Sequence, residues 1–140
     1  MRHLATAAEH LGQARGLPAV LDAACDAFEA ILQVIGDYED TTGTVCAPLL
    51  LAATQAANGR DAVLFAPSLP PRARHPPRAT QEQERGSAAG ISAATAGVSR
   101  LLAARLTHAA ALAAGADQGA CHDAARHATQ IHGLLTGHRP

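Results

Sequence analysis

The apolar residues of one stretch recur at steps of three and four, and this spacing constrains the fold more than any other feature of the chain. The stretch is LPAVLDAACDAFEAILQVIGDY, residues 17–38. Steps of three and four bring the large side chains to one side of an α-helix. Pro18 fits the first helical turn, where its missing N–H costs nothing. The sequence therefore predicts an amphipathic helix whose inward side chains are Leu17, Leu21, Ala24, Phe28, Ile31, Ile35 and Tyr38.

Similar, weaker patterns predict four further helices. We expect them over residues 3–14, 44–65, 81–114 and 117–137. Thr44 and Asp117 are the expected N-caps of the second and the fourth of these. Gly115 and Gly137 are expected to end the last two helices.

Two of these boundaries have alternatives. Asn58-Gly59 could end the helix that begins near Thr44, although we expect the helix to continue to Phe65. Thr80 and Gln83 resemble a capping box that opens the longest helix, which otherwise starts later, around Ser87. The inward stripe of the longest helix is predicted to be Ile91, Thr95, Val98, Leu102, Leu106 and Ala109, with Leu101 and Leu112 alongside.

The composition favours an all-α fold with a thin core. Alanine, the strongest helix former, supplies 35 of the 140 residues, whereas Leu, Ile, Val, Phe and Met together supply 28. Helices with so few large side chains must pack near the short end of the usual ~8–10 Å spacing. We expect one domain over residues 1–140, an antiparallel bundle of four to five helices with a proline- and arginine-rich crossover linker.

That linker is PSLPPRARHPPRA, residues 67–79, which holds five of the eight prolines. Proline pairs disfavour helix and favour extended backbone. Arg72, Arg74 and Arg78 make the linker basic, and we consider three roles: a solvated linker, docking onto another helix of this or a second subunit, and contact with nucleic-acid phosphates. The run PSLPPR also matches the P-x-x-P-x-R pattern of SH3 ligands, which we expect to be a chance match.

The helix over 17–38 carries the acidic surface that such a linker could contact. Six carboxylates and no arginine lie between Gly16 and Gly59. A catalytic carboxylate pair needs burial that pushes two pKa values apart. These acids share the polar face opposite the Phe28 stripe, so we expect a solvated face, or one that docks a basic partner.

Small residues recur in the longest helix at Gly86, Gly90, Ala93 and Gly97. Glycine inside a helix costs ~1 kcal/mol relative to alanine. Close approach of another helix, from the same chain or from a second copy across a two-fold axis, would compensate. The alternative is a helix that begins near Ser87.

The segment CHDAARHATQIH, residues 121–132, resembles a metal site in composition only. His122 and His127 are five residues apart and point ~140° away from each other on a helix. Asp123 and His127, four apart, could hold an ion together with His108 or another subunit, but a surface pair is the favoured interpretation. Cys121 is expected in the core, His122 and His127 in solvent, and His132 at the core's edge. We expect no metal site and no cofactor.

No catalytic motif is present, so we do not expect an enzyme. The three cysteines are widely spaced, which indicates reduced side chains in a reducing cytosol. Glu9 interrupts any signal-peptide core, and no apolar stretch reaches the ~18–20 residues of a membrane span. The formal net charge is −1, and arginine without lysine indicates a GC-rich bacterial genome.

These observations favour a cytoplasmic, non-catalytic protein–protein interaction module that self-associates as a homodimer and binds an unknown protein partner. One alternative is a nucleic-acid-associated accessory protein that uses Arg72, Arg74 and Arg78. The other is a small-ligand- or metal-binding bundle that uses Asp123, His127 and His108.

Overall fold

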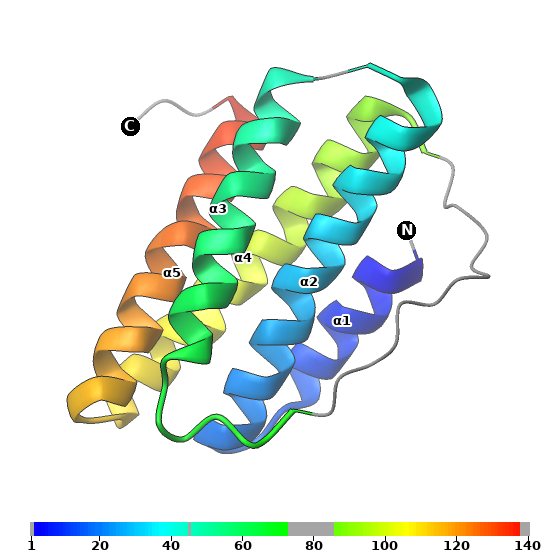
Figure 1. The fold of residues 1–140 in the computed structure, drawn as a ribbon. Coiled ribbons are helices and arrows are strands. Elements are labelled where there is room, and N and C mark those ends of the chain that lie inside the picture. Colours follow the sequence, from blue (N-terminus) through cyan, green and yellow to red (C-terminus); the bar gives the residue numbers. More distant parts are fainter. Residues whose placement is uncertain (1, 45, 73–85, 138–140) are drawn as a thin grey trace.

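The computed structural model describes residues 2–44, 46–72 and 86–137, and the regular structure in those ranges is entirely α-helical (Figure 1). The all-α class predicted from the periodicity is confirmed. The helices are α1 (Arg2–Gln13), α2 (Leu17–Thr42), α3 (Ala47–Leu64), α4 (Ala88–Leu112) and α5 (Gly115–Thr136).

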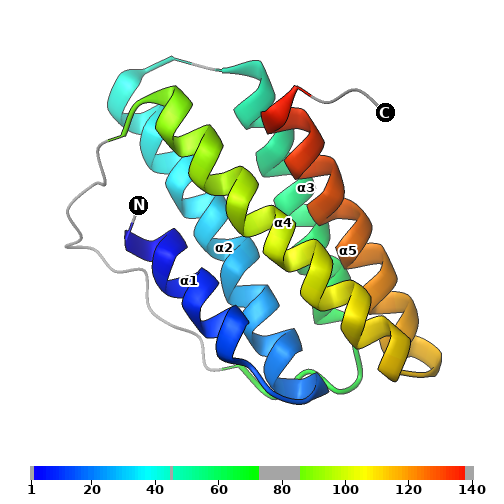
Figure 2. The ribbon, with the colours of Figure 1, turned by 180° about the vertical axis from the view of Figure 1, so that it is seen from behind.

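Four of these helices form a bundle in which neighbours run antiparallel. Around the bundle each helix contacts the next in the order α2, α3, α5, α4, and α4 in turn contacts α2. Helix α1 packs on the outside, against α2 and α4. Figures 1 and 2 show that α3 and α4 run in the same direction, so the connection between them must travel the length of the bundle. This long connection contains the linker predicted over 67–79, of which residues 67–72 lie within the described ranges.

The core is built around the predicted stripes. Phe28, Ile31 and Ile35 of α2 are fully buried, as are Leu102 and Leu106 of α4. Much of the remaining core is alanine, which leaves little distance between helix backbones. The main exception is Leu112, which was expected alongside the α4 stripe but is 78% exposed, because α4 ends at this residue.

Several helix boundaries differ from the sequence prediction. Cys46, rather than Thr44, is the N-cap of α3 and makes no side-chain cap bond. Helix α4 begins at Ala88, where Ser87 accepts a hydrogen bond from the Gly90 N–H, so the later of the two predicted starts is correct. Residues 80–85, including the Thr80–Gln83 capping box, lie outside the described residues.

The junction between α4 and α5 also differs from the prediction. Gly115 begins α5 instead of ending α4, and its positive φ of 60° is a conformation that favours glycine. Asp117 therefore lies in the first turn of α5 and is not its N-cap. Gly137 ends α5 in the left-handed conformation, as predicted.

Among the described helices, none combines the length and apolar character needed to cross a bilayer.

Candidate functional site

The His- and Cys-containing segment of α5 does not assemble a metal site. His127 Nδ1 lies 2.7 Å from Gln55 Oε1 of α3, while Asp123 pairs with Arg126 at 3.2 Å. The predicted Asp123–His127 pair is therefore replaced by two separate interactions. Within the described residues, no three His, Cys, Asp or Glu side chains are grouped closely enough to hold an ion.

The exposure of the cysteine and the three histidines of this segment agrees with the sequence prediction at every position except His127. Cys121 is fully buried, as expected, and His122 is exposed. His132 is half-buried at the edge of the core. His127 was expected in solvent, and this was wrong, because it is half-buried where α3 packs on α5. Burial lowers the pKa of His127 below its usual 6.5, and the neighbouring Arg126 charge adds to this, against a smaller opposing effect of Asp123.

Arg72 of the linker docks onto the acidic face of α2. Its guanidinium donates to Asp22 Oδ1 at 2.7 Å, to the Asp22 carbonyl at 3.0 Å and to Asp26 Oδ1, and it lies 3.6 Å from Glu29 Oε2. The Arg72 side chain is only 16% exposed. Of the three roles considered for the linker, the contacts of this arginine correspond to docking within the chain.

The electrostatics around Arg72 favour its charge. Burial lowers the pKa of Arg72, but the hydrogen bond with Asp26 and the nearby negative charges outweigh this, so the pKa is raised overall. Spacings of four and three along α2 place the three carboxylates on one side of the helix. They can therefore converge on a single planar guanidinium.

The same linker is also fixed at a second point. The Ser68 N–H donates to Asp117 Oδ1 at 2.9 Å, and the Ser68 hydroxyl donates to Asp117 Oδ2 at 2.6 Å. The chain leaving α3 is thus tied first to the start of α5 and then to α2. Arg74 and Arg78 lie outside the described residues, and both terminal nitrogens of the Arg72 guanidinium are bonded to α2.

Cys25 lies beneath the docked arginine. Its thiol is 3.9 Å from Glu29 Oε1, and the residue is fully buried. Burial raises the pKa of the Cys25 thiol to about 12, against an opposing effect of Arg72. The thiol is therefore protonated at neutral pH and a poor nucleophile.

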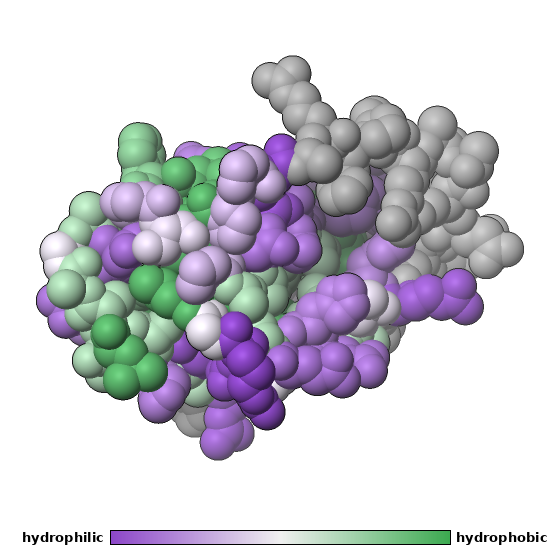
Figure 3. Space-filling model, turned by 90° about the horizontal axis from the view of Figure 1, so that it is seen from below, coloured by the Kyte–Doolittle hydropathy of each residue, from purple (hydrophilic) through white to green (hydrophobic). Residues whose placement is uncertain are grey.

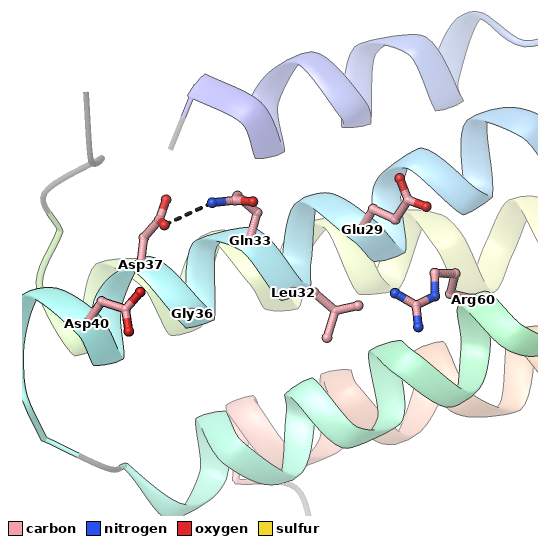
Figure 4. Close-up of a pocket in the computed structure, with 7 residues that line it drawn as sticks. All are labelled: Glu29, Leu32, Gln33, Gly36, Asp37, Asp40 and Arg60. Atoms are coloured by element: carbon pink, nitrogen blue, oxygen red, sulfur yellow. Dashed lines mark hydrogen bonds between the residues drawn. The ribbon is translucent and has the colours of Figure 1, made fainter. Parts of the chain in front are cut away.

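An open groove of about 360 Å³ continues along α2 beyond the docked arginine (Figure 4). Figure 4 shows Arg60 of α3 beside Leu32, and Gln33 donating to Asp37 at 2.9 Å. The other residues that line it are Glu29, Gly36 and Asp40. Three carboxylates and one arginine line this groove, which is open to solvent, and such a form suits a solvated polar face better than an enclosed catalytic site.

The predicted small-residue face of α4 does not pack against another helix of the described chain at Gly97. A Cβ built on Gly97 would meet no atom within 4 Å, and Ala93 is also exposed. Gly90, in the first turn of α4, and Gly86, two residues before the helix begins, are half-buried. The intrachain alternative therefore does not hold for Gly97.

Two basic residues of α4, Arg105 and His108, could in principle bind an anionic ligand. Arg105 donates instead to the carbonyl of Ala14, just beyond the end of α1, which ties α1 to α4. His108 is exposed. Arg105 therefore has a structural partner, and His108 does not combine with His127 or Asp123 in an ion-binding group within the described residues.

The feature that sequence analysis missed is an apolar surface on α3. Leu50, Leu51, Leu64 and Phe65 are 47%, 53%, 49% and 83% exposed, and Leu112 is the fifth large hydrophobic residue exposed in the described ranges. Figure 3 shows hydrophobic surface over the end of the bundle where α3 ends and α4 turns into α5.

A sequence signal for this surface was available. Leu49, Leu50 and Leu51 are consecutive, and residues on a helix turn by 100° per position, so three adjacent leucines cannot all face one core. Only Leu49 is buried. Leu64 and Phe65, at the other end of α3, are also adjacent large apolar residues, so the same geometric argument applies to them.

Comparison with known proteins gives no family model, no curated protein and no solved structure that matches this chain.

Proposed function

We propose that this chain is a non-catalytic helical-bundle protein that works through protein–protein contact and self-associates as a homodimer. The observation that carries the proposal is the exposure of Leu50, Leu51 and Leu64 on α3 and of Phe65 at its C-cap. Scattered single hydrophobic residues are normal on a protein surface, whereas several on one face mark an interaction site. Phe65 is the main candidate anchor, because aromatic side chains contribute large areas to interfaces.

The cysteines support a cytoplasmic location for this function. Cys25, Cys46 and Cys121 are all free thiols. Two of them are buried, and their pKa values are raised by burial. Unpaired thiols fit a reducing compartment.

The experiment that tests the proposal compares two exposed leucines. Light scattering after size exclusion at micromolar concentration is expected to show a dimer for the wild-type chain. Leu51→Ser on α3 is expected to shift this equilibrium towards monomer, because a leucine that the dimer would bury is replaced by a polar side chain. Leu112→Ser changes a more exposed leucine at the end of α4, and it tests whether the apolar surface at that end of the bundle, and not the start of α3, makes the contact.

Two results would contradict the proposal or change where the contact lies. A wild-type chain that is strictly monomeric at micromolar concentration rules out the homodimer. A dimer that Leu112→Ser disrupts and Leu51→Ser leaves intact would move the contact away from α3.

A further inference from the structure

Residues 66–72, the described part of the connection after α3, make few apolar contacts with the bundle, and we call this segment the strap. Ala66 is buried and Leu69 packs partly buried against the core, whereas the rest of the strap is half-buried or exposed. Three of its residues are prolines, which have no N–H to donate. A segment with so little buried apolar surface opens at a lower free energy than the whole fold.

Two polar attachments hold the strap on the helices that it crosses. Ser68 bonds to Asp117 of α5 through its N–H and its hydroxyl, and Arg72 bonds to Asp22 and Asp26 of α2. The side chains of Asp22 and Asp26 are 48% and 42% exposed, so water and salt weaken the second attachment. Both attachments can therefore be lost while the apolar stripes of the helices stay packed.

Cys25 lies beside the Arg72 attachment. It is three residues from Asp22 and four from Glu29, which places it one helical turn from each of them on α2. The thiol is 3.9 Å from Glu29 Oε1, and the charge of Arg72 is close enough to influence the pKa of the thiol. Cys25 is nevertheless fully buried, although it lies next to the half-exposed acidic face.

We infer that the strap opens as a unit while the five helices stay folded, that Arg72 is its latch, and that opening exposes Cys25 to solvent. An open strap leaves Asp22 and Asp26 without the guanidinium that they bind in the closed form, and it places a thiol in water beside them. This opening does not depend on the proposed homodimer.

Thiol labelling separates strap opening from global unfolding. Ser99→Cys supplies the reference, because position 99 is fully buried in the middle of α4. The reagent is N-ethylmaleimide, and mass spectrometry of peptides measures the rate at each cysteine. Cys25 is expected to react at least about tenfold faster than the thiol at position 99. Low urea should change the Cys25 rate little, because the strap exposes little surface, and should steeply raise the rate at position 99.

Variants of the two attachments test the latch and the unit. Arg72→Ala is expected to raise the labelling rate of Cys25 about fivefold to thirtyfold. Ser68→Ala, which removes a hydroxyl that bonds to α5, is expected to raise the same rate severalfold, because loosening either end frees the whole strap. Arg60→Ala is the matched control: the charge of Arg60 also acts on the Cys25 thiol, but this residue lies on α3. It should change the rate by less than about twofold.

Three results would overturn the inference. Equal rates at Cys25 and position 99, with the same dependence on urea, would mean that Cys25 is reached only by global unfolding. A Cys25 rate that Arg72→Ala leaves unchanged would show that Arg72 is not the latch. If Arg72→Ala accelerates labelling and Ser68→Ala does not, only the end of the strap opens and the strap is not a unit.

Discussion

At Gly59, α3 leaves no room for a side chain. A Cβ at this position would lie 2.5 Å from two ring atoms of Phe28 on α2. Phe28 is fully buried and cannot turn away into solvent. The glycine that could have ended the helix is thus inside it, and its function is to let a phenylalanine ring approach the backbone of α3.

Gly59→Ala is therefore expected to lower the free energy of unfolding by about 1–2 kcal/mol, since overpacking outweighs the gain in helix propensity. Gly97→Ala is the matched control, because a Cβ there meets no neighbour. That variant is expected to be about 0.5–1 kcal/mol more stable than wild type. Urea unfolding of the three proteins measures both changes, and a Gly59→Ala variant as stable as Gly97→Ala would contradict the close contact.

At the scale of elements, the α3–α5 contact contains a polar pair within an alanine-rich interface. His127 and Gln55 lie 2.7 Å apart, and burial lowers the pKa of the imidazole. The folded state therefore favours the neutral ring. Because the unfolded chain takes up the proton near the usual pKa of 6.5, this contact loses stability as the pH falls below that value.

We expect the free energy of unfolding of the wild-type chain to fall between about pH 7.5 and about pH 5, and to fall less in His127→Gln, which cannot titrate. The measurement is urea unfolding at both pH values. His122→Gln, on the exposed side of the same helix, is expected to keep the wild-type drop. Equal drops in all three proteins would show that His127 does not contribute.

At the scale of the whole molecule, the connection from α3 to α4 joins parts of the bundle that are distant in sequence. Ser68 ties it to α5, and Arg72 ties it to α2 about 50 residues earlier in the chain. A chain that must cross the full length of the bundle loses much conformational freedom on folding. The arginine offsets part of this loss through hydrogen bonds to Asp22 and Asp26 and an ion pair with Glu29.

Arg72→Ala is expected to lower the free energy of unfolding by about 1–2 kcal/mol, a figure that allows for carboxylates about half exposed to water. Arg72→Lys should recover only part, because an ammonium lacks the planar fork. The effect should shrink as salt is raised. Arg100→Ala, at an exposed arginine of α4, is the control and should change stability by less than about 0.5 kcal/mol. Unfolding in low and high salt that shows equal effects at both positions would contradict the docking.

The sequence by itself determined the helices, the inward stripes of α2 and α4 and the burial of Cys121. These depend on local periodicity, which a helix converts directly into a buried face. Three contacts were decided by the tertiary structure alone. Arg72 binds the acidic residues of α2, His127 contacts Gln55, and the ring of Phe28 packs against Gly59. Each of these contacts depends on which helices become neighbours and at what height they cross. An alanine-rich pattern leaves both undetermined, because small residues fit equally well against many partners.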